Sequence, residues 1–93
     1  MVIRVKGYLT FRKLVGDRSV DVGAEETLLT LLETLTVEIG DPFRHQVFAG
    51  QGGLQERVAV LVNGRSYSCL PEGLETRLQD GDEVAIFPPV MGG

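Results

Sequence analysis

The chain has 93 residues, a net charge of −4 and a single cysteine, which together indicate one small acidic domain. Domains commonly run to about 100–150 residues, so this length has no room for two hydrophobic cores. The apolar content of 43% and the charged content of 24% are typical of a globular protein and exclude a disordered or fibrous chain. General nucleic-acid binding needs a basic face, so we expect no nucleic-acid partner.

The cysteine count and the apolar runs bear on the compartment. Cys69 has no second cysteine with which to form an internal disulfide, and a lone thiol fits a reducing compartment. The longest uninterrupted apolar run, residues 58–62, is far shorter than a membrane span, and the N-terminus has no apolar stretch of the signal-peptide type. We therefore expect a cytoplasmic protein that does not contact a membrane.

The first elements are predicted from alternation. Apolar and polar side chains alternate over residues 2–12, which predicts a half-buried strand with Leu9 on its buried side. Gly7 falls on the same apolar face, where a glycine indicates a bulge or a close approach of backbone. A turn at residues 16–17 and a second alternating run over 19–22 then complete a predicted hairpin.

After Gly23 the period of the apolar residues becomes that of a helix. Thr27 is the best candidate for the N-cap, and Gly40 supplies the C-terminal stop. Leu29 and Val37 fall beside the main stripe, which predicts that the helix is covered broadly on one side. The stripe itself consists of Leu28, Leu31, Leu32, Leu35 and Ile39.

The middle of the chain is less regular. Residues 42–48 can form a helical turn, and the glycines of residues 50–53 indicate a flexible loop. The valine-rich run 58–62 predicts a buried strand. Asn63-Gly64 is a strong signal for a two-residue hairpin, with residues 65–70 as the return strand.

The last part of the domain completes the fold class. Leu74 and Leu78 are spaced for one helical turn, residues 80–82 form a turn, and residues 83–87 alternate as a final strand. The sequence therefore predicts an α+β domain, a mixed sheet of four or five strands packed on one helix. We expect this domain to span residues 1–87 and to be followed by a flexible tail, residues 88–93.

Few side chains suggest catalysis or metal binding. His45 has no metal-ligating neighbour at suitable spacing beyond Asp41, so we expect a surface or packing role and no metal site. Cys69 is predicted to be a partly buried structural thiol. The loop of residues 50–53 follows no strand, opens no helix and lacks the Lys-Ser/Thr of a phosphate loop. The acidic residues 80–83 lack the pattern of a calcium loop and fit a tight turn.

The end of the chain is the most informative segment. It reads Phe87-Pro88-Pro89-Val90-Met91-Gly92-Gly93. The two prolines stop strand pairing and enforce an extended path, and the glycines make the last residues as thin as a polypeptide can be. Such a tail can thread a narrow channel and present its terminal carboxylate inside a partner. A frayed terminus is the alternative.

These residues resemble the C-terminal signature of the MoaD/ThiS family, which are ubiquitin-like sulfur carriers with the β-grasp fold. The similarity is carried by residues 78–93, and residues 27–33 and 60–65 also match the family's usual helix and strand segments. The ending resembles MoaD, the small subunit of molybdopterin synthase, more than the thiamin sulfur carrier. The length of segment 41–57 resembles the extended MoaD-like group, and Met91 stands where Ala or Ser is common.

The resemblance implies a chemistry that needs little from this chain. An E1-like activating enzyme (an adenylyltransferase) would use ATP and Mg²⁺ to adenylate the carboxylate of Gly93, and a sulfur donor would convert it to a thiocarboxylate. The large subunit of molybdopterin synthase would then receive the sulfur for molybdenum or tungsten cofactor synthesis. The carrier itself would bind no cofactor and would have no catalytic side chains. The residues expected to contact the partner are Phe87, Pro88, Pro89, Val90, Met91 and Gly92.

Other functions use the same tail and remain open at this point. The carrier could supply sulfur to another acceptor, in cysteine, thiamin or tRNA thiolation, or it could be a protein modifier joined to lysines through Gly93. A plain interaction module with an inert tail is a further alternative. The whole net charge lies in residues 72–93, just ahead of the tail in sequence. There it either steers the terminus toward a basic partner or merely keeps a turn solvated.

Overall fold

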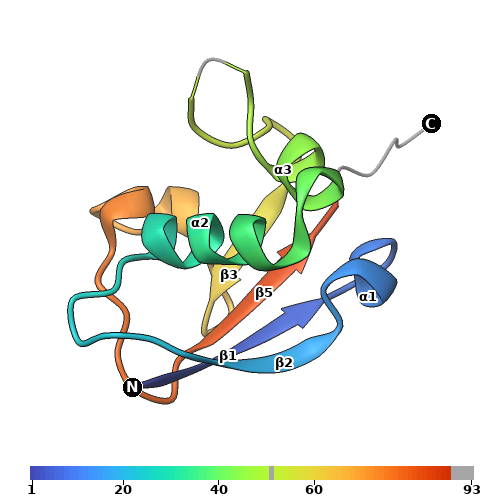
Figure 1. The fold of residues 1–93 in the computed structure, drawn as a ribbon. Coiled ribbons are helices and arrows are strands. Elements are labelled where there is room, and N and C mark those ends of the chain that lie inside the picture. Colours follow the sequence, from blue (N-terminus) through green and yellow to red (C-terminus); the bar gives the residue numbers. More distant parts are fainter. Residues whose placement is uncertain (51, 89–93) are drawn as a thin grey trace.

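The computed structural model describes residues 1–50 and 52–88, which form a five-stranded sheet with its helices on one face (Figure 1). The strand order is β2-β1-β5-β3-β4. β1 and β5 are parallel and the other neighbours are antiparallel, so the sheet is mixed. The predicted α+β fold class is confirmed. The strands are β1 (Val2–Gly7), β2 (Asp17–Asp21), β3 (Ala59–Val62), β4 (Arg65–Ser66) and β5 (Glu83–Phe87).

The longest helix, α2 (Leu28–Ile39), crosses the sheet and supplies most of the helical side of the core (Figure 1). As predicted, Thr27 caps it: the Thr27 hydroxyl accepts the Thr30 backbone N–H at 3.2 Å, and the Thr30 hydroxyl accepts that of Thr27 at 2.9 Å. Gly40, at φ 103°, ends it. The predicted broad coverage is wrong, because Val37 lies on the side away from the sheet and is 86% exposed.

The shorter helices complete the covered side of the sheet. They are α1 (Phe11–Leu14), α3 (Asp41–Val47) and the 3₁₀ turns η1 (Tyr67–Cys69) and η2 (Gly73–Glu75). Phe11 and Phe43 are fully buried, and their ring centroids lie 6.0 Å apart. This contact joins α1 to α3 at the end of the sheet where β5 finishes (Figure 1).

The strand predicted over residues 2–12 is wrong beyond Gly7. β1 ends there, the chain reverses through Leu9 at φ 57°, and α1 begins at Phe11. Leu9 is 59% exposed instead of buried. The cause is the close approach that Gly7 permits: a Cβ atom on Gly7 would lie 2.4 Å from the Phe11 carbonyl oxygen. The alternating pattern is the same whether the strand continues or the chain turns back. The packing of α1 against Gly7 therefore decides where β1 ends, and the pattern does not reveal it.

We expect Gly7→Ala to destabilise the domain by about 2–3 kcal/mol, because the new methyl group meets backbone that cannot move aside cheaply. Urea unfolding measures the change. Gly23→Ala is the matched control, since nothing lies within 4 Å of a Cβ atom built there. Equal stabilities for the two variants would contradict the packing of α1 against β1.

Two further predictions of the sequence need correction in the second half of the chain. The hairpin turn at Asn63 and Gly64 is present, with φ of 50° and 86°, but the return strand stops at Ser66. The Ser66 side chain accepts the Ser68 backbone N–H at 3.4 Å and starts η1. Cys69 therefore lies exposed in a 3₁₀ turn instead of partly buried in a strand.

The helical turn predicted from Leu74 and Leu78 is confirmed only for Leu74, in η2. Leu78 is buried beyond that turn, where its backbone N–H donates to the carbonyl of Glu26 at 2.9 Å. A bridge between Thr27 and Arg77 precedes it. The segment that leads into β5 is thus tied to the start of α2 by backbone hydrogen bonds.

Candidate functional site at the end of strand β5

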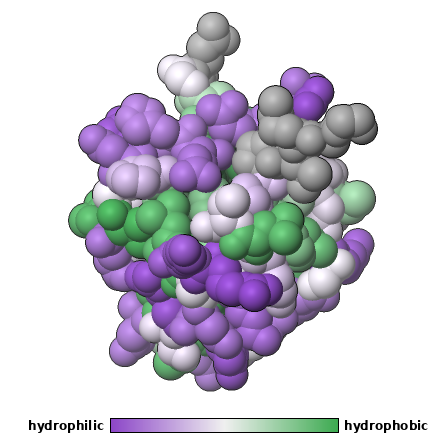
Figure 2. All heavy atoms as spheres, turned by 90° about the vertical axis from the view of Figure 1, so that its right-hand side faces the viewer, coloured by the Kyte–Doolittle hydropathy of each residue, from purple (hydrophilic) through white to green (hydrophobic). Residues whose placement is uncertain are grey.

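Strand β5 is the middle strand of the sheet and leads directly into the C-terminal segment. Phe87 is its last residue, and Pro88 is buried. Figure 2 faces this end of the molecule and shows hydrophobic side chains interspersed with hydrophilic ones. The other candidate residues, Pro89, Val90, Met91, Gly92 and Gly93, lie outside the described residues. The described part of the candidate site is therefore the surface around Phe87.

Phe87 is held by an aromatic contact that sequence reasoning missed. Its ring stacks on that of Tyr8 with centroids 4.6 Å apart and planes 6° from parallel. The Tyr8 backbone N–H also donates to the carbonyl of Ile86 at 3.0 Å, which extends the parallel pairing of β1 and β5 by one bond. Tyr8 therefore supports the strand end from which the tail leaves.

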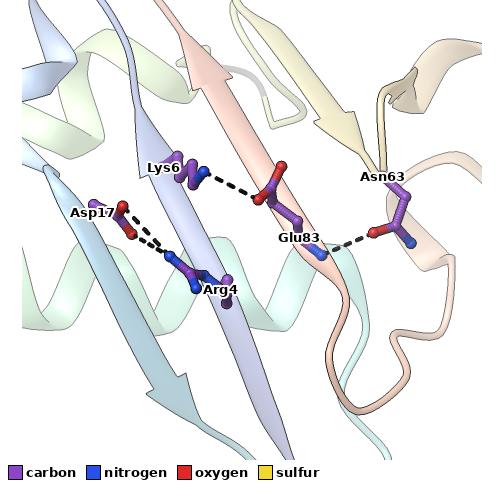
Figure 3. Close-up of polar contacts among 5 residues, drawn as sticks. All are labelled: Arg4, Lys6, Asp17, Asn63 and Glu83. Carbon is purple, nitrogen blue, oxygen red and sulfur yellow. Dashed lines mark hydrogen bonds and ion pairs between the residues drawn. The ribbon is translucent and has the colours of Figure 1, made fainter.

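The open face of the sheet carries ion pairs that join β1 to its neighbours (Figure 3). Arg4 reaches Asp17 on β2 at 3.2 Å, and the Lys6 ammonium lies 3.3 Å from the Glu83 carboxylate on β5. Asn63 accepts the Glu83 backbone N–H at 3.0 Å through its side-chain oxygen. Exposed pairs of this kind contribute less than about 1 kcal/mol each, so they fix register more than stability.

The acidic turn lies at the start of β5, away from Phe87. Asp80 accepts the Val2 backbone N–H at 2.7 Å, and Asp82 accepts the Gln79 backbone N–H at 2.8 Å and the Asn63 side-chain amide at 2.9 Å. These carboxylates anchor the start of β5, whereas the tail leaves its end. With a rise of about 3.3 Å per residue, the five residues of β5 separate the two by roughly 16 Å. The acidic cluster, close to the tail in sequence, lies at the opposite end of the sheet.

The described side chains offer little chemistry of their own. No three His, Cys, Asp or Glu side chains within residues 1–50 and 52–88 are placed to hold a metal ion. His45 is exposed on α3, and Cys69 is exposed in η1. None of the helices in these two ranges has the length and apolarity to cross a bilayer. What this end of the molecule offers is the surface around Phe87, which leads into the C-terminal residues.

Comparison with known families decides the relationship. The ThiS family profile matches residues 8–93, which is nearly the whole chain and includes its last residue. The chain belongs to the ThiS family. Its five-stranded mixed sheet with a crossing helix is the ubiquitin-like β-grasp fold implied by the resemblance.

Relatives of this ThiS-family chain carry two kinds of name. Small archaeal modifier protein 3 of Haloferax volcanii is 35% identical over all of both chains. A putative sulfur carrier protein of Archaeoglobus fulgidus is 36% identical over 84% of this chain and 85% of its own. The relatives therefore include both a modifier and a carrier.

Several solved structures also resemble this chain. SAMP1 of Haloferax volcanii superposes with a TM-score of 0.81 at 29% identity over all of both chains. A putative molybdopterin converting factor subunit 1 of Pyrococcus furiosus superposes with a TM-score of 0.73 at 26% identity, over 96% of this chain and 98% of its own. One chain of the BexX/CysO complex of Amycolatopsis orientalis superposes with a TM-score of 0.74 at 26% identity, over 98% of this chain and 99% of its own. The predicted family is confirmed, while a special closeness to MoaD is not.

Proposed function

We propose that this ThiS-family chain is a sulfur carrier and small modifier that acts through the activated carboxylate of Gly93. The observation that carries the proposal is the family match, which runs to the C-terminal residue. The names of the relatives support both uses of such a terminus, sulfur delivery and attachment to a protein. The two uses share a first step, adenylation of the carboxylate.

The chemistry explains why the domain itself needs no catalytic side chain. A carboxylate is a poor electrophile, so an activating enzyme uses ATP and Mg²⁺ to join it to AMP. Pyrophosphate is released in this step. Sulfide delivered by a sulfur donor then attacks the acyl carbon, AMP leaves, and the sulfur remains as the thiocarboxylate of Gly93. Attack by a lysine amine on the same carbon would instead form an isopeptide. This chain supplies the terminus and the surface that positions it.

The expected partners are therefore an E1-like activating enzyme and a sulfur donor, with an acceptor that differs between pathways. The BexX/CysO complex supports the general point that a structurally similar carrier assembles with a partner protein. The buried Pro88 and the stacked Phe87 fix the base of the tail. A partner that covers this base can draw the remaining residues into its active site.

The test is the intact mass of the protein isolated from its own host. A sulfur-for-oxygen difference located on Gly93 establishes the carrier role, and isopeptide adducts establish the modifier role. The last tryptic site is Arg77, so trypsin leaves residues 78–93 on a modified lysine. Cyanogen bromide cleaves after Met91 and leaves Gly92-Gly93 there instead. If the host protein shows an unmodified terminus and no adducts while the activating enzyme is active, the proposal fails.

A second, narrower candidate is the small subunit of molybdopterin synthase. Two observations favour it: the Pro-Pro-Val-x-Gly-Gly ending and the similarity to the Pyrococcus furiosus converting factor. Thiocarboxylated protein mixed with a synthase large subunit is then expected to convert the cofactor precursor. Absence of conversion, with thiocarboxylate confirmed by mass, would leave the acceptor among the cysteine, thiamin and tRNA pathways or among proteins.

A further inference from the structure

The turn between β1 and α1 presents an exposed leucine beside the end of β5. Leu9 has φ 57°, a conformation that bulky side chains rarely adopt, and its side chain is 59% exposed. Asparagine or glycine would suit this backbone better, and a polar side chain would suit the exposure better. Residues held in such conformations cluster at binding sites, where the surrounding structure keeps them in place.

Hydrogen bonds on both sides of Leu9 fix this turn. The Leu9 carbonyl accepts the Arg12 backbone N–H at 3.0 Å, and the Tyr8 carbonyl accepts that of Phe11 at 3.0 Å. Tyr8 in turn stacks on Phe87. Leu9 is therefore held next to the aromatic pair from which the tail departs, and its exposure is a fixed property of the fold.

The same turn brings basic side chains to this end of the sheet. Arg12 lines a hollow together with Lys6, Tyr8 and Asp17. Lys6 pairs with Glu83, but Arg12 and Lys13 form no ion pair with any residue in the described part of the chain. The carboxylate of Asp17, which also lines this hollow, pairs with Arg4, so Arg12 has no ion-pair partner among the described residues. A carboxylate on a partner would complement it.

We propose that Leu9 and Arg12 form the docking surface for the activating enzyme that takes the tail, with Leu9 in an apolar pocket and Arg12 against a carboxylate at its rim. The proposal rests on the proposed function, because an enzyme that draws Gly93 inward must cover the surface around Phe87. Figure 2 shows this end, where exposed hydrophobic side chains adjoin strongly hydrophilic ones. An apolar anchor within a charged rim is the usual composition of a protein interface.

Leu9→Asn is the sharpest test, because asparagine accepts the left-handed backbone and removes only the apolar contact. We expect the variant to be at least as stable in urea as the parent chain. The Kd for the activating enzyme is expected to rise at least about tenfold. In ATP–pyrophosphate exchange the KM is expected to rise while kcat stays the same, since docking contributes equally to ground and transition states. Val37→Asn, which removes an exposed valine from α2, is the matched control and is expected to leave Kd unchanged.

Arg12→Glu is the second variant and leaves the turn itself intact. It is expected to slow association and to lose most of its effect at high salt, because the contact is exposed and electrostatic. If the parent chain is not adenylated at all, the proposed function fails. If the parent chain is adenylated and both variants keep its Kd and KM, the proposed function stands and the docking surface is overturned.

Discussion

Removal of Gly93 is expected to reduce adenylation of the chain at least about a hundredfold, because it withdraws the reacting carboxylate by one residue, about 3.5 Å. Misplacement of a reacting group by as little as about 1 Å can cost a hundredfold in rate. The free energy of unfolding is expected to stay the same, since the buried apolar residues in the described part of the chain lie between Ile3 and Pro88. ATP–pyrophosphate exchange and urea unfolding measure the two quantities.

Two substitutions sharpen that experiment. Met91→Ala keeps the length and introduces a residue that is common in the family, so it is expected to retain activity. Gly92→Val also keeps the length but thickens the chain next to the carboxylate, and it is expected to lose activity. Near-parental exchange by the chain that lacks Gly93 would show that the terminus is not the reactive group, and an inert-tail interaction module would then be favoured.

The parts of the fold that could be predicted are those with local causes. Helix α2 follows from a stripe of leucines, an N-cap at Thr27 and a glycine stop at Gly40, all contained in fourteen residues of continuous sequence from 27 to 40. The turn at Asn63-Gly64 is equally local, because it depends on residues that tolerate positive φ. In both cases the residues that determine the element are the residues that form it.

The predictions are wrong where contacts between residues distant in the sequence determine the path of the backbone. Whether β1 continues past Gly7 depends on the close approach of the Phe11 carbonyl. The alternating pattern of side chains does not predict this contact. The return strand after Gly64 ends at Ser66, whose side chain starts a 3₁₀ turn. Cys69 lies in this turn and is exposed. Patterns of apolar residues report which side chains are buried more reliably than they report the direction of the backbone.

The candidate site likewise has parts that can be predicted from local sequence and parts that depend on distant contacts. The tail was recognisable as a sequence, but its support by Tyr8 depends on the parallel pairing of β1 with β5, which joins the two ends of the chain. The acidic residues next to the tail in sequence lie at the far end of β5 and bind the backbone of Val2 and Gln79. Their charge therefore lies away from Phe87, the last residue of β5.

The largest loss of stability is expected from Phe11→Ala, at about 3–5 kcal/mol, because the ring is fully buried and the cavity cannot close easily. Small domains have only about 5–15 kcal/mol of net stability, so a large share would be lost. The cavity would open between α1 and α3, where Phe11 meets Phe43. Amide hydrogen exchange is expected to accelerate first at Val15 and Gly16, whose N–H groups donate to the Phe11 carbonyl.

A double-mutant cycle with Phe43→Ala measures how far α1 and α3 depend on each other. The two rings lie 6.0 Å apart, so their coupling energy is expected to be about 0.5–1.5 kcal/mol. Phe48→Ala is the matched control, since Phe48 is only partly buried against the same core and should cost less. Strictly additive losses for Phe11 and Phe43 would mean that the two helices pack independently. In that case the turn that holds Leu9 would draw its rigidity from its own backbone hydrogen bonds, the close approach at Gly7 and the Tyr8–Phe87 stack.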